Sequence, residues 1–450
     1  MATIMPFQGY RFNTGLVKNL GAAMAPPYDM ITDEDKDFLY KQHDYNMARI
    51  IRGKSFDGDT DTQNCYTRAG VFLQDWIQNK ILIQDPKPSF YLYEMRVEYK
   101  NTEFTNQGLI ALMGLEPLGE DSRIMTCEDT KPSSKEDRYR LLSAINANAD
   151  PISCMYIDHE KPLSNFLNEV SEQKPDMEFG TRESITGAAT YQRVWVIDDP
   201  EAVAFIQQSL STKQLFITDG HNRYETALEY KKFCAANNPS HTGRESYNYI
   251  MTLLTNAYGD GLVQLPVHRY LKKDKKFLES YFIAGAQDRF KVEKIIVDTH
   301  VDELVDIMKK QISTPRLDQN RIAVYCGGNY FYRLILKDKE YLKSILPDKS
   351  DAYRSLDVTV LNTLILNELL NITHENYREN VGFTKRASKG IAQVQAGESP
   401  CLFLINPVKH EQICAVAMAG ELMPERTVFL FPKAATGVVV YKFADEVKKT

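Results

Sequence analysis

The sequence predicts a mixed α/β (or α+β) protein. Short apolar runs typical of strands intermix with stretches whose apolar residues recur at helical spacing, from one end of the chain to the other. No repeat of 20–50 residues is present. At 450 residues the chain is too long for one compact core, so two or three domains are expected. A change in character near residue 270 divides it into residues 1–270 and an additional α/β region, 271–450.

The elements of the first region follow from these patterns. Residues 6–60 are rich in turn signals, and the next apolar residues share one face of a predicted helix at 62–80. Farther along, the pattern predicts strands at 91–95, 109–113 and 194–197, and helices through 138–142 and at 200–210.

The second region continues the same alternation. Lys-rich helical stretches flank two strand-like runs, and the strongly apolar segment 356–370 predicts a buried helix. The predicted elements are helices within 272–290 and 302–311, and strands at 322–325, 330–336, 401–405, 413–418 and 428–431.

Composition narrows the classes of function. The net charge is −6 and no long Lys/Arg block offsets it, which argues against a nucleic-acid partner. The N-terminal residues lack the apolar region of a signal peptide, and no apolar run reaches bilayer length. We therefore expect a cytoplasmic protein with no membrane partner; the sequence leaves its oligomeric state open.

The spacing of the cysteines and histidines argues against disulfide bonds and structural zinc sites. The seven cysteines are scattered with no Cys-x-x-Cys pair, which is typical of reduced thiols. The eight histidines show no zinc-ligand spacing, so neither a disulfide nor a structural zinc is expected. Gly-x-Gly-x-x-Gly and Gly-x-x-x-x-Gly-Lys are also absent, and nothing indicates NAD or PLP.

The most informative segment is 214–230, QLFITDGHNRYETALEY. An apolar run ends at Asp219-Gly220, a strong turn signal, and helical spacing begins near Asn222, so a strand, a tight turn and a helix start are predicted. A helix N-terminus favours an anion such as phosphate, and Arg223 adds a forked donor. Asp219 and His221 are candidates to hold a metal or move a proton. An alternative stays open: Asn222 and Glu225 also fit an ordinary capping box.

Four other polar segments carry candidates. The rigid turn at 25–29 would aim Tyr28 and Asp29 into a cleft or form only a corner. The run 127–131 contains a candidate buried acid, and it is followed by the charged stretch 135–138. The segment 266–269 follows the apolar stretch 262–265 and would project His268 and Arg269 from a strand end, although a satisfied structural histidine at a sheet edge is the plainer interpretation. A lysine stands in the glycine turn 431–437. The candidates in the segments after the turn at 25–29 are Glu128, Arg138, His268, Arg269 and Lys433.

Taken together, these segments resemble the bacterial and archaeal family called Domain of Unknown Function 1015, nearly end to end. The resemblance rests on motifs in the same order: 6–11, 25–31 with Asn46, Glu128 with Thr130, 135–138, 219–228, 266–269, 423–424, 431–433 and 436–437. The Asp-Gly-His-x-Arg element also resembles that of ParB-like and sulfiredoxin-like folds, some of which are kinases of free serine. The resemblance therefore implies a ParB/sulfiredoxin-like catalytic core within 1–270.

This chain departs from the family pattern in three places. Asn222 replaces a second histidine, Cys127 stands where a histidine commonly precedes the glutamate, and 425–427 replaces a Lys-Ser pattern after Met-Pro. These changes are compatible with retained activity or with a member that has lost it.

Two hypotheses follow from the resemblance. The first is a small-molecule phosphotransferase that uses ATP or ADP with Mg²⁺ on a small substrate such as serine. Its catalytic group is Asp219, His221, Glu128 and Asp29, with Asp219 the candidate Mg²⁺ ligand; its phosphate group is Gly220, Asn222, Arg223, Arg138, Arg269 and Lys433; its substrate group is Tyr28, Glu225 and His268. The second is a non-catalytic sensor or binding protein for an anionic metabolite.

The substitution Arg223→Lys distinguishes a phosphate-binding role of Arg223 from a structural role. If it binds phosphate, Arg223→Lys weakens that binding by about 1.5–3 kcal/mol and leaves folding intact. If it packs against Glu225 or the C-terminal segment instead, the same change lowers the melting temperature.

Overall fold

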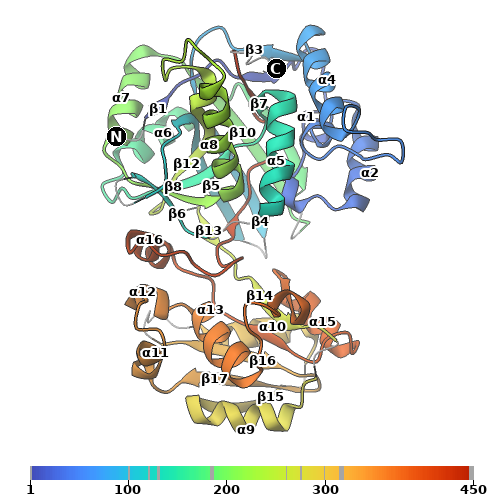
Figure 1. Ribbon diagram of the computed structural model, residues 1–450, viewed down its shortest axis with the longest axis vertical. Coiled ribbons are helices and arrows are strands. Elements are labelled where there is room, and N and C mark those ends of the chain that lie inside the picture. The colour runs from blue at the N-terminus through green and yellow to red at the C-terminus, as the bar shows by residue number, and fades with distance from the viewer. Residues whose placement is uncertain are drawn as a thin grey trace. The chain divides into compact units, whose positions relative to one another are not determined.

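The chain forms two compact units. The computed structural model describes residues 3–99, 102–119, 122–128, 132–182, 187–259, 261–273, 276–297, 299–313 and 319–444; Asp129, Thr130 and Lys131 of the acidic run lie outside them. Unit 1 comprises 1–126, 130–263 and 430–450, and unit 2 comprises 127–129 and 264–429 (Figure 1). The division differs from a single boundary near 270 because the chain returns to unit 1 after residue 429. There Val440 exchanges backbone hydrogen bonds of 2.8 and 2.9 Å with Tyr10.

Unit 1 is built on a nine-stranded mixed sheet of order β6-β11-β8-β12-β5-β4-β10-β9, with β1 also on β5. β11 runs parallel to β6 and antiparallel to β8, and β12 runs parallel to β8. The remaining pairs are antiparallel. The strands are β1 (Ile4–Met5), β4 (Phe90–Tyr99), β5 (Thr102–Gly114), β6 (Ile124–Thr126), β8 (Ile152–Tyr156), β9 (Met177–Arg182), β10 (Ala189–Ile197), β11 (Leu215–Asp219) and β12 (Tyr249–Asn256).

Both faces of this sheet are buried, as side-chain alternation along β4 shows. Tyr91 and Tyr93 enter one hydrophobic core, whereas Phe90 and Leu92 enter the other. A strand buried on both faces is continuously apolar rather than alternating. That is why β4 and β5 contain the unbroken apolar runs 90–93 and 109–113.

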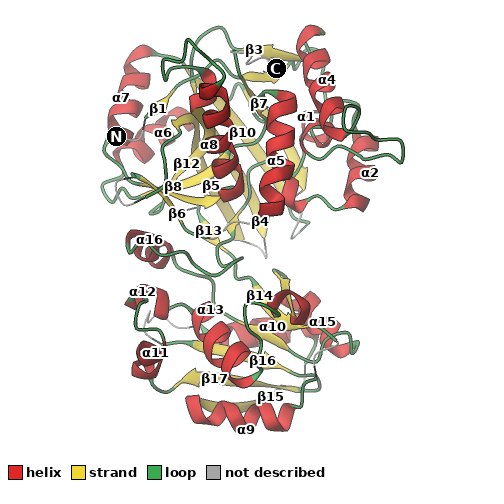
Figure 2. Cartoon of the chain, in the orientation of Figure 1, coloured by secondary structure: helices red, strands yellow, loops and turns green. Residues whose placement is uncertain are grey.

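Helices cover the two faces (Figures 1 and 2). α6 and α7 join the core of Phe90, and α4 and α5 join that of Tyr91, while α8 contributes to both. α5 and α8 lie side by side, with the rings of Tyr139 and Tyr230 6.0 Å apart. The helices of unit 1 are α1 (Leu20–Ala23), η1 (Tyr28–Met30), α2 (Asp33–Gln42), α3 (Ala48–Ile51), α4 (Cys65–Gln78), α5 (Pro132–Ile145), α6 (Pro162–Ser171), α7 (Pro200–Ser211), α8 (His221–Ala236) and η2 (Ser246–Asn248).

Short ladders tie the ends of unit 1 to its sheet. β2 (Tyr10–Phe12) pairs with β3 (Leu82–Gln84), and β21 (Tyr441–Lys442) pairs with β7 (Ala147–Asn148). β13 (Val263–Gln264) and β20 (Leu430–Phe431) lie where the chain crosses between the units.

Unit 2 has a six-stranded sheet of order β15-β17-β16-β19-β14-β18, and each of these pairs is antiparallel. α10 and α15 pack on it over a core that includes Met308, Phe331 and Ile391. Its elements are β14 (His268–Leu271), α9 (Glu279–Arg289), β15 (Phe290–Ile296), α10 (Val301–Ile312), β16 (Arg321–Tyr325), β17 (Tyr330–Leu336), α11 (Lys339–Ile345), α12 (Asp351–Arg354), α13 (Asp357–Val360), the π-helix η3 (Leu361–Leu369), α14 (Tyr377–Asn380), β18 (Val381–Thr384), α15 (Ala387–Gln395), β19 (Leu402–Leu404) and α16 (His410–Met418).

The predicted mixed α/β class is confirmed, and one predicted element is wrong. The segment 413–418 belongs to helix α16, not to a strand. Its buried residues, Ile413, Cys414, Val416 and Ala417, share one helical face, and a capping box at Lys409 starts the helix. A six-residue apolar window looks the same in either structure. None of the helices within the described ranges is long and apolar enough to span a bilayer.

Candidate functional site

The predicted strand, turn and helix at 214–230 are confirmed. β11 is a buried strand that ends at Asp219, and α8 begins at His221. Between them Gly220 takes φ +89°, and it is the N-cap of the helix, with no side-chain capping bond. Asn222 is therefore the second helical residue, so the alternative in which Asn222 caps the helix is wrong. The first-turn N–H groups point at the end of the strand where Asp219 lies.

Gly220→Ala is expected to lower the unfolding free energy by about 1–3 kcal/mol, because a Cβ is strained at positive φ. A Cβ built on Gly220 would also lie 2.7 Å from Cγ2 of Ile152 and 2.9 Å from the Arg223 guanidinium. Urea unfolding measures the loss. Gly187→Ala is the matched control: its φ is +70° but it has open space around it, so a loss as large in that variant would show that φ alone is responsible.

The carboxylate of Asp219 is hydrogen-bonded to two cationic side chains. Its Oδ1 accepts a hydrogen bond from Lys433 Nζ at 2.9 Å, and its Oδ2 accepts one from Arg223 Nη2 at 3.1 Å. Burial opposes ionisation of this carboxyl, but the fields of Lys433 and Arg223 outweigh it and hold the pKa at about 2. Asp219 is thus an anion at neutral pH and a weak base.

Lys433 connects Asp219 to the N-terminal segment. Its Nζ also donates to Asp29 Oδ2 at 2.9 Å, and its side chain is only 10 % exposed. The two carboxylates raise the pKa of Lys433 against the effect of burial, so the ammonium stays charged. Asp29 is more open, with 40 % of its side chain exposed.

Backbone pairing explains why residues 29 and 433 meet. Ala25 and Thr436 exchange backbone hydrogen bonds of 3.2 and 2.8 Å, which sets the Pro-Pro turn beside the lysine turn. Buried Asn46 holds the first of these segments by donating to the carbonyls of Ala22 and Met24. The turn at 25–29 therefore places Asp29 against Lys433.

Arg223 is bound by the protein itself. Its Nη1 donates to Asp150 Oδ2 at 2.5 Å and to the Pro151 carbonyl at 2.9 Å, while Nη2 binds Asp219. Neither Glu225 nor the C-terminal segment is among these partners, and Glu225 pairs with Lys135 instead. The guanidinium therefore positions Asp219 against the loop before β8.

Tyr28 lies between two arginines. Its ring centroid is 4.0 Å from the guanidinium carbon of Arg138 and 5.8 Å from that of Arg223. Arg138 is buried, pairs with Asp137 and donates to the Ile51 carbonyl at 3.2 Å. Burial raises the pKa of Tyr28, so its hydroxyl remains protonated at neutral pH.

His221 is buried at the start of α8. Burial lowers its pKa to about 4, although Asp219 and other neighbours favour the charged form. The imidazole is therefore neutral at physiological pH, and a hydrogen bond to the Ile217 backbone is among the contacts that favour its charged form.

Acid is expected to destabilise unit 1 through His221. Since its folded pKa of about 4 is below the ordinary 6.5, the unfolded chain binds the extra proton first. The stabilisation is complete above pH 6.5 and is lost as pH falls toward 4, by about 3 kcal/mol for a displacement of this size. Unfolding free energies between pH 7.5 and 4.5 test this: His221→Gln should flatten the slope and exposed His374→Gln should not.

Three predicted site residues belong to unit 2. Glu128 accepts hydrogen bonds from the backbone N–H groups of Thr427, at 2.9 Å, and Val428. Arg269 is fully buried and donates to the carbonyls of Val267, Glu425 and Arg426. Arg269 also hydrogen-bonds the Tyr377 side chain and lies over the Phe383 ring, 5.3 Å from its centroid.

His268 lies in β14, between β19 and β18 rather than at the edge of the sheet. Burial lowers its pKa to about 3, and its Nδ1 accepts from the Ile405 N–H at 3.3 Å. Its Nε2 is buried and has no hydrogen-bond partner among the described residues, so the expectation of a satisfied histidine at a sheet edge is wrong.

Asp150 is the residue of this cluster that sequence reasoning missed. It stands before the β8 strand in Asn-Ala-Asp-Pro, a pattern that indicates a loop and no particular role. All seven cysteines are free thiols. Within the described residues no group of three or more His, Cys, Asp or Glu gathers at metal-binding distance.

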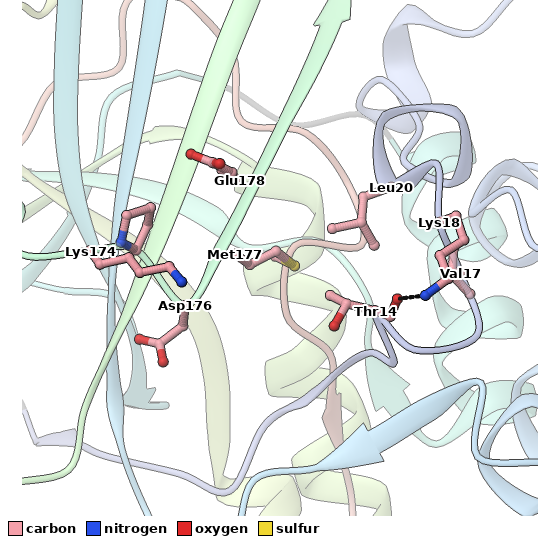
Figure 3. A pocket seen from close by; sticks show the side chains of 9 residues that line it. Thr14, Val17, Lys18, Leu20, Lys174, Asp176, Met177 and Glu178 are labelled. Carbon is pink, nitrogen blue, oxygen red and sulfur yellow. Dashed lines mark hydrogen bonds between the residues drawn. The ribbon is translucent and has the colours of Figure 1, made fainter.

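A pocket of about 380 Å³ lies elsewhere in unit 1, between residues 14–20 and 174–178 (Figure 3). Its polar groups have structural partners: Lys18 donates to the Thr14 carbonyl at 3.3 Å, Asp176 accepts from the Val196 N–H at 2.8 Å, and Glu178 binds the Tyr191 hydroxyl. It shares no residue with the cluster around Asp219.

Comparisons with solved structures give low structural scores. A conserved hypothetical protein from Pyrococcus furiosus is 12% identical, with 68% of this chain and 87% of that chain covered and a TM-score of 0.31. A free serine kinase in complex with AMP is 11% identical over 70% and 87%, with a TM-score of 0.32. SbnI with a C-terminal truncation, from Staphylococcus aureus, is 11% identical over 72% and 85%, with a TM-score of 0.33.

A comparison with curated proteins finds no match. The family model described as Protein of unknown function (DUF1015) matches residues 4–359, which is more than half of the chain. The resemblance seen in the ordered motifs is thereby confirmed, and the chain belongs to this family.

Proposed function

We propose that this protein is a nucleotide-dependent small-molecule phosphotransferase whose site is the cluster of Asp29, Lys433, Asp219 and Arg223. The observation that carries the proposal is the position of Lys433. A charged ammonium is held between two carboxylates from distant segments, at the end of a buried strand and beside a helix N-terminus. Phosphoryl transfer depends mainly on such positioned charge.

In this proposal Lys433 receives a phosphate of the nucleotide, together with the first-turn amides of α8. An incoming phosphate competes with Asp29 and Asp219 for the ammonium, so the lysine is already charged and oriented before the ligand arrives. Arg223 acts through Asp219: its Nη1 is bound to Asp150 and Pro151 and its Nη2 to Asp219, which fixes the carboxylate.

Asp29 is the base that we assign to the acceptor hydroxyl. It is the more exposed of the two carboxylates on Lys433, at 40 % against 27 % for Asp219. A base must reach the proton that it removes, and an open carboxylate beside the phosphate-binding cation meets that need. A free amino acid such as serine is the acceptor that the Asp-Gly-His-x-Arg motif favours, by its resemblance to serine kinases.

The residues present also suit Mg²⁺ brought in with a nucleotide. Asp29 and Asp219 bind the same ammonium, so the two carboxylates are near each other, and Mg²⁺ is commonly held by one or two carboxylates with phosphate oxygens. Of the two, Asp219 would hold the ion, which supplies charge neutralisation on the phosphates and leaves Asp29 as the base.

One observation favours the second candidate function, a non-catalytic binding protein for an anionic metabolite. The pKa values of Asp219 and His221, at about 2 and 4, make both weak bases at neutral pH. A site of fixed cations and weak bases binds an anion without transferring a proton.

Nucleotide turnover distinguishes the two functions. The protein is incubated with Mg²⁺ and ATP or ADP, with a panel of free amino acids including L-serine, and both the nucleotide and phosphorylated products are followed. Acceptor-dependent turnover supports the enzyme. A nucleotide-induced rise in melting temperature without turnover supports the binding protein, and neither response with any nucleotide contradicts both.

Asp29→Asn is expected to lower turnover by about 10²–10⁴-fold, the usual contribution of a general base. Its effect on folding should stay within about 1 kcal/mol, because the ion pair it breaks is partly exposed. Asp33→Asn, on the nearby helix α2 and 90 % exposed in its pair with Lys36, is the matched control. Equal turnover in the two variants would remove Asp29 from the reaction.

A further inference from the structure

Two cysteines of unit 2, Cys326 and Cys401, stand at the adjoining ends of neighbouring strands. β16 ends at Tyr325 and β19 begins at Leu402, and these two residues form the final pair of the antiparallel ladder between the strands. Carrying that register one residue further sets Cys326 opposite Cys401. Both are free thiols.

The backbone of Cys401 is directed at the other neighbour of β19. Its carbonyl accepts a hydrogen bond of 3.1 Å from the N–H of Leu271, at the end of β14. The N–H and C=O of one strand residue point to the same side, so Cys401 offers no ladder hydrogen bond toward β16. It therefore forms a non-hydrogen-bonded pair with Cys326, the kind in which Cα atoms lie about 4.5 Å apart and side chains are closest. Disulfides join Cα atoms that are about 4.4–6.8 Å apart.

Both thiols belong to the same face of the sheet. Tyr325 and Leu402, the residues next to them, enter the core beneath α10 and α15. Because side chains alternate along a strand, Cys326 and Cys401 are directed to the opposite face. Burial raises the pKa of Cys401 and the neighbouring Cys326 raises it further, as expected for two thiols close together.

Cys326 is the thiol that a small reagent can reach. It is partly exposed, whereas Cys401 is fully buried. Burial raises the pKa of Cys326 to about 12, and the carboxylate of Glu279 adds to this effect. Its thiolate is therefore scarce at neutral pH, which makes its attack on another sulfur slow.

We propose that Cys326 and Cys401 form a reversible disulfide between β16 and β19 when the protein meets a low-molecular-weight disulfide, RSSR. Cys326 loses its proton to water and its thiolate attacks one sulfur of RSSR, which releases RS⁻. Cys401, deprotonated in turn, attacks Sγ of Cys326 in this mixed disulfide and releases the second RS⁻. The two protein thiols lose two electrons and two protons, and RSSR becomes two RSH.

This disulfide would join two central strands of unit 2. β16 and β19 lie next to each other inside the six-stranded sheet, and the chain between the two cysteines includes η3 and α15. A cross-link that closes so long a loop restricts the unfolded chain. Oxidation is therefore expected to stabilise unit 2, and it does not depend on phosphoryl transfer in unit 1.

Disulfide mapping of the full-length protein tests the proposal. The protein is incubated with glutathione disulfide until its free-thiol count is constant, and the remaining thiols are blocked with iodoacetamide before digestion and mass spectrometry. We expect peptides joined through Cys326 and Cys401 that dithiothreitol separates, and a melting temperature raised by at least about 5 °C. Alkylation of both cysteines, glutathione alone on Cys326, or a link from either to another cysteine would overturn the proposal.

Variants test the order of the two steps. Cys401→Ala should stop the reaction with glutathione on Cys326, whereas Cys326→Ser should leave Cys401 a free thiol; neither variant should gain stability on oxidation. Cys65→Ser is the matched control, a partly exposed cysteine of α4, and it should keep the cross-link. If Cys401→Ala does not fold, Cys326→Ser decides, since glutathione on Cys401 in that variant would refute initial attack by Cys326.

Discussion

Lys433→Met is expected to lower the unfolding free energy by about 3 kcal/mol and to abolish nucleotide binding. Removing one partner of a buried ion pair leaves an uncompensated charge and costs about 3–5 kcal/mol. The lower end applies because Asp219 keeps Arg223 and because Asp29 is 40 % exposed. Urea unfolding gives the first quantity, and the nucleotide-induced shift in melting temperature gives the second.

A double variant shows whether charge is the cause. Adding Asp29→Asn to Lys433→Met removes one of the two repelling carboxylates, so it should recover part of the lost stability without restoring nucleotide binding. Lys87→Met is the control, since Lys87 pairs with Asp198 while 65 % exposed and should cost less than 1 kcal/mol. If Lys433→Met costs no more than that control and nucleotides still bind, Lys433 has neither role.

The local fold around this site was predictable because its signals lie close together in sequence. The apolar run before Asp219 specifies a buried strand, Gly220 alone adopts the positive φ of the turn without strain, and the following residues have helical spacing. The convergence of the turn at 25–29 with residue 433 was expected only from the family resemblance. Nothing in either segment encodes the Ala25–Thr436 pairing that brings them together.

Other features depend on contacts that sequence patterns do not contain. The return of residues 430–444 to unit 1 rests on long-range backbone pairing, so a division into two consecutive regions could not anticipate it. The segment 413–418 was predicted as a strand because short apolar windows fit either period. Asp150 was missed because its role comes from a long-range contact: it accepts a hydrogen bond from the Arg223 guanidinium only in the folded chain.

Arg223→Met is expected to cost about 3–5 kcal/mol of folding stability, the value for breaking a buried ion pair. The side chain of Arg223 is 10 % exposed, and its partner Asp150 is 14 % exposed, so solvent cannot replace the lost cation at Asp150 and Asp219. Arg223→Lys keeps the charge but loses the planar fork that contacts three acceptors, and should cost about 2 kcal/mol. This loss of folding stability is the opposite of the result expected if the guanidinium donors were reserved for phosphate, in which case Arg223→Lys would leave folding intact.

Three measurements decide between the two roles of Arg223. Urea unfolding of Arg223→Lys should show the loss, and Arg140→Lys, an exposed arginine of α5, should stay within about 0.5 kcal/mol of the parent protein. The Asp150→Asn variant should lose stability as well, and combining it with Arg223→Met should cost less than the sum, because the two residues share one ion pair. If Arg223→Lys instead folds as stably as the parent and binds nucleotide more weakly, the guanidinium contacts phosphate directly, and Asp219 must be positioned by Lys433 alone.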